Sequence, residues 1–313
     1  MSEPRIKVLC IDDESRILRA LKALFRDMDV HVTTDPKEAI RWAGEFDIDV
    51  VVCDQRMPKM QGIEVLREIR IAHPRAMRIL LTGYADLGAV LGSVNEGEVF
   101  RYINKPWDNA ELRETVQLAA KIARDAPVVQ DKAMDDVSRE MARREVGILV
   151  IEDDPEVQQR MREILQPHYQ VRFASSPERA LQVLEKHETG VVISETAGQH
   201  GDFTALIKAL KQYHPHIATV VVTDRANANV AIDLINEGQV FRLLLKPVRM
   251  GSCRLSVDAA VGRYWQLKQN PSATRRYIVA PRAESQLPSW LAGSLMQRIK
   301  LLPSRLLGLA RAH

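Results

Sequence analysis

The sequence predicts an α/β protein made of two doubly wound (βα)5 domains, each with a parallel five-stranded sheet. Short apolar runs such as IKVLCI and IDVVVCD lack the alternation of half-exposed strands, which is typical of strands covered on both faces. Amphipathic stretches such as ESRILRALKALF follow these runs, with apolar residues at helical spacing. The same order returns in the second half, where NEGQVFR at 236–242 repeats NEGEVFR at 95–101.

Strands and helices are expected to alternate five times in each half. In the first half we expect strands at 6–11, 30–34, 48–54, 76–82 and 99–105, and helices at 14–28, 36–46, 62–73, 85–97 and 107–125. In the second half we expect strands at 146–152, 169–175, 190–194, 217–223 and 239–246, and helices at 155–166, 177–188, 202–214, 226–238 and 252–268.

These elements divide the chain into a first domain at 1–124, a linker at 125–145, a second domain at 146–268 and a tail at 269–313. The linker is expected to be largely helical and to prolong the last helix of the first domain. The tail begins as a loop and becomes a basic amphipathic segment, with leucines and isoleucines at helical spacing. We favour a tail helix that folds back on its own domain over contact with a membrane surface or a partner groove.

The bulk composition is that of a globular protein. Of the 313 residues, 46% are hydrophobic and 27% are charged, and the net charge is only +3. This charge does not imply nucleic-acid binding by itself, and no DNA-binding domain is recognised after either copy, so direct DNA binding is not expected. No apolar run reaches the roughly 18 residues of a membrane span, and no signal peptide opens the chain, so a cytoplasmic location is expected.

Five polar residues at strand ends recur at one spacing. Each member of the first set has a counterpart 141 positions later: Asp12, Asp13, Asp54, Thr82 and Lys105 correspond to Asp153, Asp154, Glu195, Thr223 and Lys246. The carboxyl ends of parallel strands meet at one edge of a sheet, so each set is expected to converge on one small cleft. Clustered carboxylates repel one another unless a hard cation lies between them, and oxygen ligands with room for water favour Mg²⁺.

Both halves resemble the receiver domains of two-component response regulators, which have a flavodoxin-like, CheY-like fold. The first half contains the motifs IDDE, VVCDQRMPKMQG, LTGYA and YINKPW in the order and spacing of that family. The resemblance covers residues 1 to about 124 and about 146 to 268, and the second copy is degenerate.

The resemblance implies a role for each residue of the first site. Asp54 would be the phosphoacceptor. Asp12, Asp13, Asp54 and the backbone carbonyl of Arg56 would hold Mg²⁺. Lys105 would neutralise charge on the transferred group, in a reaction that depends on positioning and electrostatics.

Two further pairs of residues carry roles by the same resemblance. Thr82 would bind a phosphoryl oxygen while Tyr102 rotates into the vacated space, which makes the two a conformational switch. Arg56 and Tyr84 would control access of water, and we expect a long-lived phosphoryl group because Tyr84 is bulky and Arg56 can pair with the phosphate.

The second copy has Glu195 at the phosphoacceptor position, and Leu243 stands where the first copy has Tyr102. Three interpretations stay open for Glu195: it mimics phosphorylation by pairing with Lys246, it completes an acidic cluster in a partner-binding domain, or it still accepts phosphate. The third is the least favoured. We expect a pseudo-receiver that serves docking or dimerisation.

The sequence therefore predicts a response regulator and not an enzyme, with at most slow self-dephosphorylation. Its expected partners are a sensor histidine kinase or histidine phosphotransfer protein, a downstream protein target and a second copy of itself. The alternatives are a phosphorylation-independent adaptor that regulates a partner enzyme, a phosphorelay intermediate, and a hydrolase that uses Asp54 as a transient nucleophile. The last would need a substrate pocket or a cap insertion, and none is recognised between the short loops.

Overall fold

The computed structural model describes residues 4–83, 99–125, 134–195, 197–198, 201–223, 234–236, 240–277, 291 and 294–302. The chain divides into two compact units, Met1–Gln130 and Asp131–His313, and each is described by itself. The helix expected at 85–97, and most of the one expected at 226–238, lie outside the described residues.

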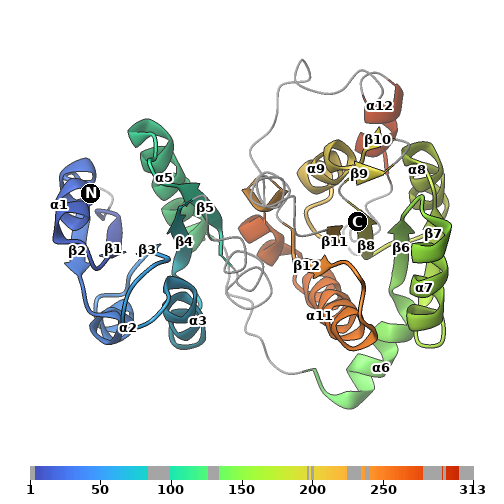
Figure 1. Cartoon of the computed structure of the whole chain (residues 1–313), viewed down its shortest axis with the longest axis horizontal. Helices are drawn as coiled ribbons and strands as arrows, with labels where there is room; N and C mark the ends of the chain where they lie inside the picture. The colour runs from blue at the N-terminus through green and yellow to red at the C-terminus, as the bar shows by residue number, and fades with distance from the viewer. Residues whose placement is uncertain are drawn as a thin grey trace, which may run out of the picture. The chain divides into compact units, whose positions relative to one another are not determined.

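The first unit contains one parallel sheet with the strand order β2-β1-β3-β4-β5 (Figure 1). Its strands are β1 (Lys7–Ile11), β2 (Asp29–Thr33), β3 (Val50–Asp54), β4 (Met77–Thr82) and β5 (Arg101–Asn104). Its described helices are α1 (Ser15–Leu24), α2 (Pro36–Glu45), α3 (Gly62–Ala72) and α5 (Asn109–Asp125). The doubly wound sheet expected for this half is confirmed.

Helices cover both faces of this sheet. Val8, Cys10 and Val52 belong to the core that α1 and α5 complete. On the other face, α2 packs on α3, and these helices contact β1 and β3. β3 is buried along its whole length, which explains why its sequence VVVCD shows no alternation.

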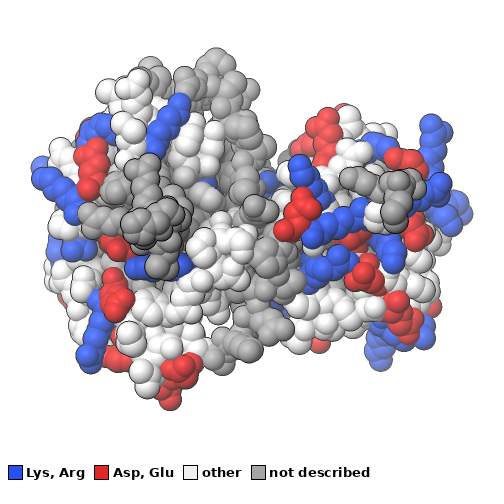
Figure 2. All heavy atoms as spheres, turned by 180° about the vertical axis from the view of Figure 1, so that it is seen from behind, with Lys and Arg blue, Asp and Glu red and all other residues white. Residues whose placement is uncertain are grey.

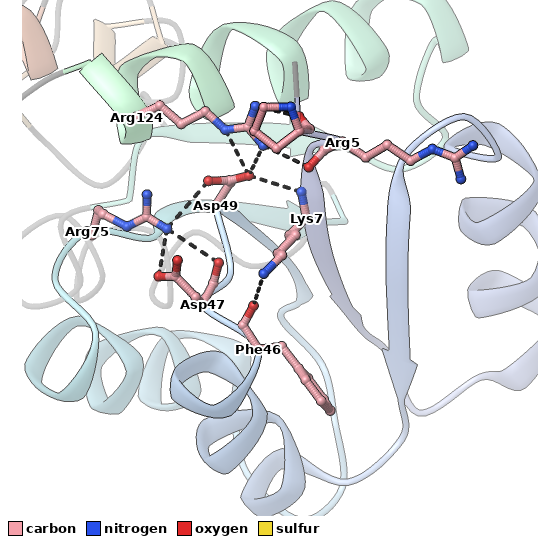
Figure 3. A network of polar contacts seen from close by, with 8 residues as sticks. Arg5, Lys7, Phe46, Asp47, Asp49, Arg75 and Arg124 are labelled. Atoms are coloured by element: carbon pink, nitrogen blue, oxygen red, sulfur yellow. Dashed lines mark hydrogen bonds and ion pairs between the residues drawn. The ribbon is translucent and has the colours of Figure 1, made fainter. Parts of the chain in front are cut away.

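The amino-terminal edge of this sheet is held by a polar network around Asp49, just before β3 (Figure 3). Asp49 is only 3% exposed, and its carboxylate accepts hydrogen bonds from the Lys7 amide at 3.0 Å and from Arg124 Nη2 at 2.7 Å. Arg124 also donates to the carbonyl oxygens of Pro4 and Arg5, at 2.9 and 2.8 Å. The end of α5 therefore holds the amino-terminal segment beside the sheet.

The second unit repeats the sheet, with the order β12-β11-β8-β6-β7, which is the order of the first unit read from the other end. Its strands are β6 (Gly147–Ile151), β7 (Gln170–Ala174), β8 (Val191–Glu195), β11 (Ala218–Thr223) and β12 (Arg242–Leu245). Two short antiparallel strands, β9 (Ala197–Gly198) and β10 (Gly201–Asp202), follow β8. The described helices are α6 (Asp136–Glu145), α7 (Pro155–Leu165), α8 (Pro177–Lys186), α9 (Thr204–Tyr213), α11 (Met250–Gln269) and α12 (Ser294–Lys300), with a 3₁₀ helix, η1 (Pro271–Tyr277).

The linker helix α6 is a separate helix of the second unit. It begins after Asp135, whose carboxylate accepts a hydrogen bond from the Ser138 amide at 2.7 Å. Ala142 is fully buried in the core of the second unit, and Arg143 makes two 2.9 Å hydrogen bonds to Asp258 of α11. The expectation that the linker prolongs the last helix of the first domain is therefore wrong.

The tail folds back onto its own unit, as expected. Leu291 and Ile299 are fully buried in the same apolar cluster as side chains of α8 and α9. The residues directly after α11, expected as a loop, instead form η1. Residues 303–313 lie outside the described part of the chain.

The described surface carries mixed charge. Figure 2 shows basic and acidic side chains interspersed over the described parts of both units, in keeping with the net charge of +3. Among the described helices, none is long and apolar enough to cross a bilayer.

Candidate functional site

Three carboxylates meet at the carboxyl edge of the first sheet. The pairing of Ile11 with Cys53 places Asp12, just after β1, next to Asp54 at the end of β3. One carboxylate oxygen each from Asp12, Asp13 and Asp54 lies within 4.8 Å of the others. Asp12 and Asp54 are buried and Asp13 is exposed, so the cluster is open to solvent on one side. The convergence predicted from the strand ends is confirmed for these residues.

Lys105, just after β5, bridges the two buried carboxylates. Its ammonium lies 2.6 Å from Asp54 Oδ1 and 2.9 Å from Asp12 Oδ2. Burial lowers the pKa of Lys105, but its hydrogen bonds to Asp54 and Asp12 outweigh this and hold that pKa above its ordinary value. Burial also raises the pKa of Asp12, and the hydrogen bonds from Lys105 and the Glu14 amide offset only part of that rise. Lys105 is therefore held in its protonated form beside Asp54.

The chain after β3 is shaped closely around Asp54. The Arg56 amide donates to Asp54 Oδ2 at 2.9 Å, so both carboxylate oxygens have a partner. Gly62 opens α3 directly against the Asp54 carbonyl, and a Cβ on this glycine would lie 2.0 Å from that oxygen. Only a residue without a side chain can make this approach without moving the backbone. The loop thus packs closely against Asp54 at the carboxyl edge of the sheet.

Of the other residues predicted for the first site, the structure describes Thr82 and Tyr102 but not Tyr84. Thr82 ends β4 with 1% exposure, its hydroxyl donates to the Gly83 carbonyl at 3.2 Å, and its own carbonyl accepts from the Lys105 amide at 2.8 Å. Tyr102 is 2% exposed in β5, beside β4. Tyr84 lies outside the described residues.

The donor set fits a divalent cation. Three carboxylates face one ammonium, so two negative charges stay unbalanced in a largely buried site. All the ligand atoms are oxygens, and Asp13 faces solvent, which suits a hard ion such as Mg²⁺ that keeps several of its waters. Asp12, Asp13 and Asp54 would hold it.

The second unit has a matching pocket, but its residues differ by one position from those predicted. The three carboxylates that meet are Glu152, Asp153 and Glu195, again with oxygens within 4.8 Å of one another. Ile151 pairs with Ser194, so Glu152 occupies the place of Asp12, and Asp153 that of Asp13. The predicted pairing of Asp12 and Asp13 with Asp153 and Asp154 is therefore wrong.

Asp154 instead caps helix α7. Its carboxylate accepts hydrogen bonds from the Glu156 and Val157 amides at 2.8 and 3.3 Å, and Pro155 takes the first helical position. A sequence signal for this was available, because Asp followed by Pro at the start of an amphipathic stretch is typical of a helix N-terminus. Glu152 was missed because the predicted strand included it.

The second pocket is closed by its own ion pair. Lys246 lies 2.5 Å from Glu195 Oε1 and 3.8 Å from Glu152 Oε2. Burial, together with the neighbouring Glu195, raises the pKa of Glu152 to about 7. Thr223 is 2% exposed, and its carbonyl accepts from the Lys246 amide at 2.9 Å, as Thr82 does from Lys105.

Tyr102, the predicted switch residue, has no aromatic counterpart at the matching position of the second unit. Leu243, 3% exposed in β12, pairs with Val221 of β11, just as Tyr102 of β5 pairs with Leu80 of β4. A leucine has no hydroxyl and no planar ring to move between two positions.

Comparison with known proteins agrees with this geometry. The family model of the response regulator receiver domain matches residues 8–117 and 148–258, which together make up more than half of the chain. The chain is 36% identical over 122 residues to the hydrogenase transcriptional regulatory protein HoxA of Cupriavidus necator, and 33% identical over 118 residues to the regulatory protein AtoC of Escherichia coli. The matched regions are 39% and 37% of this chain but only a quarter of each relative.

Solved structures give similar matches. A signal receiver domain of an HD domain-containing protein from Pseudomonas fluorescens is 31% identical, with a TM-score of 0.38 over 39% of this chain and 92% of that one. A response regulator receiver domain protein from Clostridium thermocellum is 36% identical, with a TM-score of 0.35 over 37% and 94%. The two family matches, each on a five-stranded parallel sheet with an acidic pocket at its carboxyl edge, show that this chain belongs to the response regulator receiver domain family and carries the domain twice.

Proposed function

We propose that the protein acts in two-component signalling by accepting a phosphoryl group on Asp54 of the first unit. The observation that carries this proposal is the pocket itself, in which Asp54 lies beside Asp12 and Asp13 with Lys105 at 2.6 Å. The donor would be a phosphohistidine of a sensor histidine kinase or of a histidine phosphotransfer protein. The protein would then act through contacts with a downstream protein and not as an enzyme, and the cytoplasmic location belongs to this proposal.

The reaction exchanges one bond to phosphorus for another. An oxygen of the Asp54 carboxylate attacks the phosphorus, the P–N bond to the donor histidine breaks, and a P–O bond forms to give an acyl phosphate. Because Lys105 and the Arg56 amide occupy the two oxygens of Asp54, one of these contacts is released for attack. The Lys105 ammonium is placed to exchange its contact with the Asp54 carboxylate for a contact with the phosphoryl oxygens. Mg²⁺, held by Asp12, Asp13 and Asp54, would supply further charge neutralisation.

The phosphorylated state would be read through Thr82 and Tyr102. Release of the Thr82 hydroxyl from the Gly83 carbonyl would let it donate to a phosphoryl oxygen. Tyr102 lies in β5, next to the strand that Thr82 ends, so it is placed to respond to that movement. Arg56 and Tyr84 would set the lifetime of the acyl phosphate, and we expect a half-life longer than seconds.

The test is intact-protein mass spectrometry after incubation with acetyl phosphate and Mg²⁺. We expect one phosphoryl adduct on the wild-type chain, none on Asp54→Ala, and one on the matched second-unit variant Glu195→Gln. A wild-type chain that is folded but gains no adduct would refute phosphoacceptance at Asp54. An adduct that survives in Asp54→Ala would place the acceptor elsewhere.

The second unit supports a phosphorylation-independent role. The 2.5 Å contact between Lys246 and Glu195 already occupies the lysine that would meet a phosphoryl group, and Leu243 replaces the aromatic switch residue. We propose that this unit is a fixed docking or dimerisation module. If Glu195→Gln changes neither partner binding nor oligomeric state, the charge pair is not a phosphorylation mimic.

A further inference from the structure

Two equivalent positions, one in the second helix and one at the end of the third helix of each unit, make different contacts in the two units. In the first unit, Gly44 of α2 lies against the imidazole of His73, which ends α3, and a Cβ on Gly44 would lie 2.0 Å from His73 Cε1. The glycine therefore lets the ring fill the space between the helices, and α2 packs directly on α3.

The corresponding residues of the second unit, 141 positions later, are Glu185 and His214. Both residues hold the tail helix α12. Glu185 pairs with Arg298 through two hydrogen bonds of 2.7 and 2.9 Å, and His214 Nε2 donates to the Ile299 carbonyl at 2.7 Å. α12 thus packs against both α8 and α9 (Figure 1), and the surface of these two helices that it covers is called the groove below.

The contact is that of an amphipathic helix in a groove. Four apolar side chains of the tail are buried against α8, α9 and the sheet: Leu291, Met296, Ile299 and Leu302. The neighbouring Leu301 is 79% exposed, so burial is confined to one side of the segment. Apolar anchors at this spacing are typical of helix-in-groove recognition, and Arg298 opposite Glu185 sets the orientation.

The groove helix is an addition to a fold that is complete without it. The first unit has the same sheet order, and in its described residues α2 packs directly on α3 at the matching place. α12 has only seven residues, which is too short for a helix to be stable by itself in water. Its helical form therefore depends on the groove, as expected for a bound ligand segment.

We propose that the groove between α8 and α9 is a recognition site for an amphipathic protein helix, and that α12 occupies it as a built-in competitor. The partner helix would present apolar residues in the pattern of Met296, Ile299 and Leu302, with an arginine facing Glu185. It would bind only when α12 leaves. This device is independent of phosphorylation at Asp54.

The test uses the full-length chain and a fluorescent peptide with the sequence of residues 291–302. In the opened variant, Arg298→Glu with Ile299→Asp, α12 loses both its ion pair and a buried anchor. We expect this variant to bind the peptide, and the wild type to bind it about tenfold or more weakly because its groove is filled. The matched control Leu301→Asp changes an exposed residue of the same segment and should behave as wild type.

Charge reversal tests the site of binding. In a chain opened by Ile299→Asp alone, Glu185→Arg should abolish binding of the peptide, and a peptide with Arg298→Glu should restore it. A folded opened variant that binds no peptide, or a wild-type chain that binds it as tightly, would overturn the proposal.

A second measurement does not depend on any variant. In the wild-type chain, backbone amides of 294–302 should exchange hydrogen much faster than those of β6 and β8, because the segment leaves by local opening. If these amides exchange only when β6 and β8 do, α12 is part of the cooperative core and the proposal fails.

Discussion

The Lys211 ammonium is buried, and burial disfavours its charged form. It is 4% exposed in α9, and its Nζ donates to the carbonyl oxygens of Pro215 and Ile217 at 2.8 and 3.0 Å. Burial lowers its pKa from 10.5 to about 7. Above pH 7 the folded state therefore loses this proton while the unfolded chain keeps it.

The expected consequence is a second unit that becomes more stable as the pH rises from 7 to 8.5. Over this range the unfolded state binds more protons than the folded state. The free energy of unfolding of the second unit therefore increases with pH, by up to about 2 kcal/mol. The window ends below pH 9, where burial of thiols such as Cys253, whose pKa is raised to about 11, begins to act in the opposite direction. Urea-dependent hydrogen exchange of β6 and β11 measures the change.

Lys211→Met should remove most of this slope, and Lys208→Met on the same helix should retain it. Equal slopes in wild type and Lys211→Met would show that Lys211 keeps its proton in the folded state.

Glu195 differs from Asp54 by one methylene, and Glu152 differs from Asp12 in the same way, whereas Asp153 has the same side chain as Asp13. Glu152, Asp153, Thr223 and Lys246 all lie where their counterparts lie in the first unit. Shortening the side chain withdraws the carboxylate from Lys246 toward the position that Asp54 holds in the first unit.

We therefore expect the double variant Asp54→Ala with Glu195→Asp to gain one phosphoryl adduct from acetyl phosphate and Mg²⁺, while Asp54→Ala alone gains none. Intact-protein mass spectrometry distinguishes them. The yield should be below that of wild-type Asp54, because the sequence after Glu195 lacks the Met-Pro that follows Asp54. A double variant without any adduct would show that the extra methylene of Glu195 is not by itself what disables this unit.

At the scale of elements, the end of α5 is held by Arg124. Its guanidinium joins the carboxylate of Asp49 to two carbonyl oxygens of the amino-terminal segment (Figure 3). Arg124→Met keeps the apolar stem and leaves the buried carboxylate with fewer donors. We expect the first unit to lose about 2 kcal/mol of its free energy of unfolding.

Arg113→Met is the matched control, on the same helix. Arg113 pairs with Asp27, which is 53% exposed on the surface, so its removal should cost less than about 1 kcal/mol. Hydrogen exchange of β1 and β3 at increasing denaturant concentration measures the loss of free energy of unfolding in each of the two variants. Equal losses would show that the buried network adds nothing beyond a surface pair.

How well the elements could be predicted depended on whether their signal was local. The strands follow from continuous apolar runs, and α12 follows from the spacing of Leu291, Leu295 and Ile299. The linker was expected to be helical and contains α6, but its attachment to the first domain was wrong because its partner, Asp258 of α11, is distant in the sequence. The partners of α12 were equally hidden, since Glu185 and His214 carry no sequence signal for binding a helix.

At the scale of the whole molecule, duplication was the strongest signal. One offset of 141 aligned Asp54, Thr82 and Lys105 with their counterparts, and the structure places each set at one sheet edge. The same uniform offset misled at the first strand, because the second unit has one residue more between its acidic pair and the end of β8. A fixed offset assumes loops of equal length, and only the strand register shows that they differ.

Each unit has its own core and its own polar network, so damage to one should not depend on damage to the other. Asp258 accepts hydrogen bonds from Arg143 and, at 2.6 Å, from the Tyr169 hydroxyl. Asp258→Asn should release α6 and cost the second unit about 2 kcal/mol. Combined with Arg124→Met, the two losses should add within about 0.5 kcal/mol, because the sites share no residue. Hydrogen exchange of β1 and β6 reports each unit separately in single and double variants. A double variant whose loss in either unit departs further from the sum would show that the units stabilise each other as they fold.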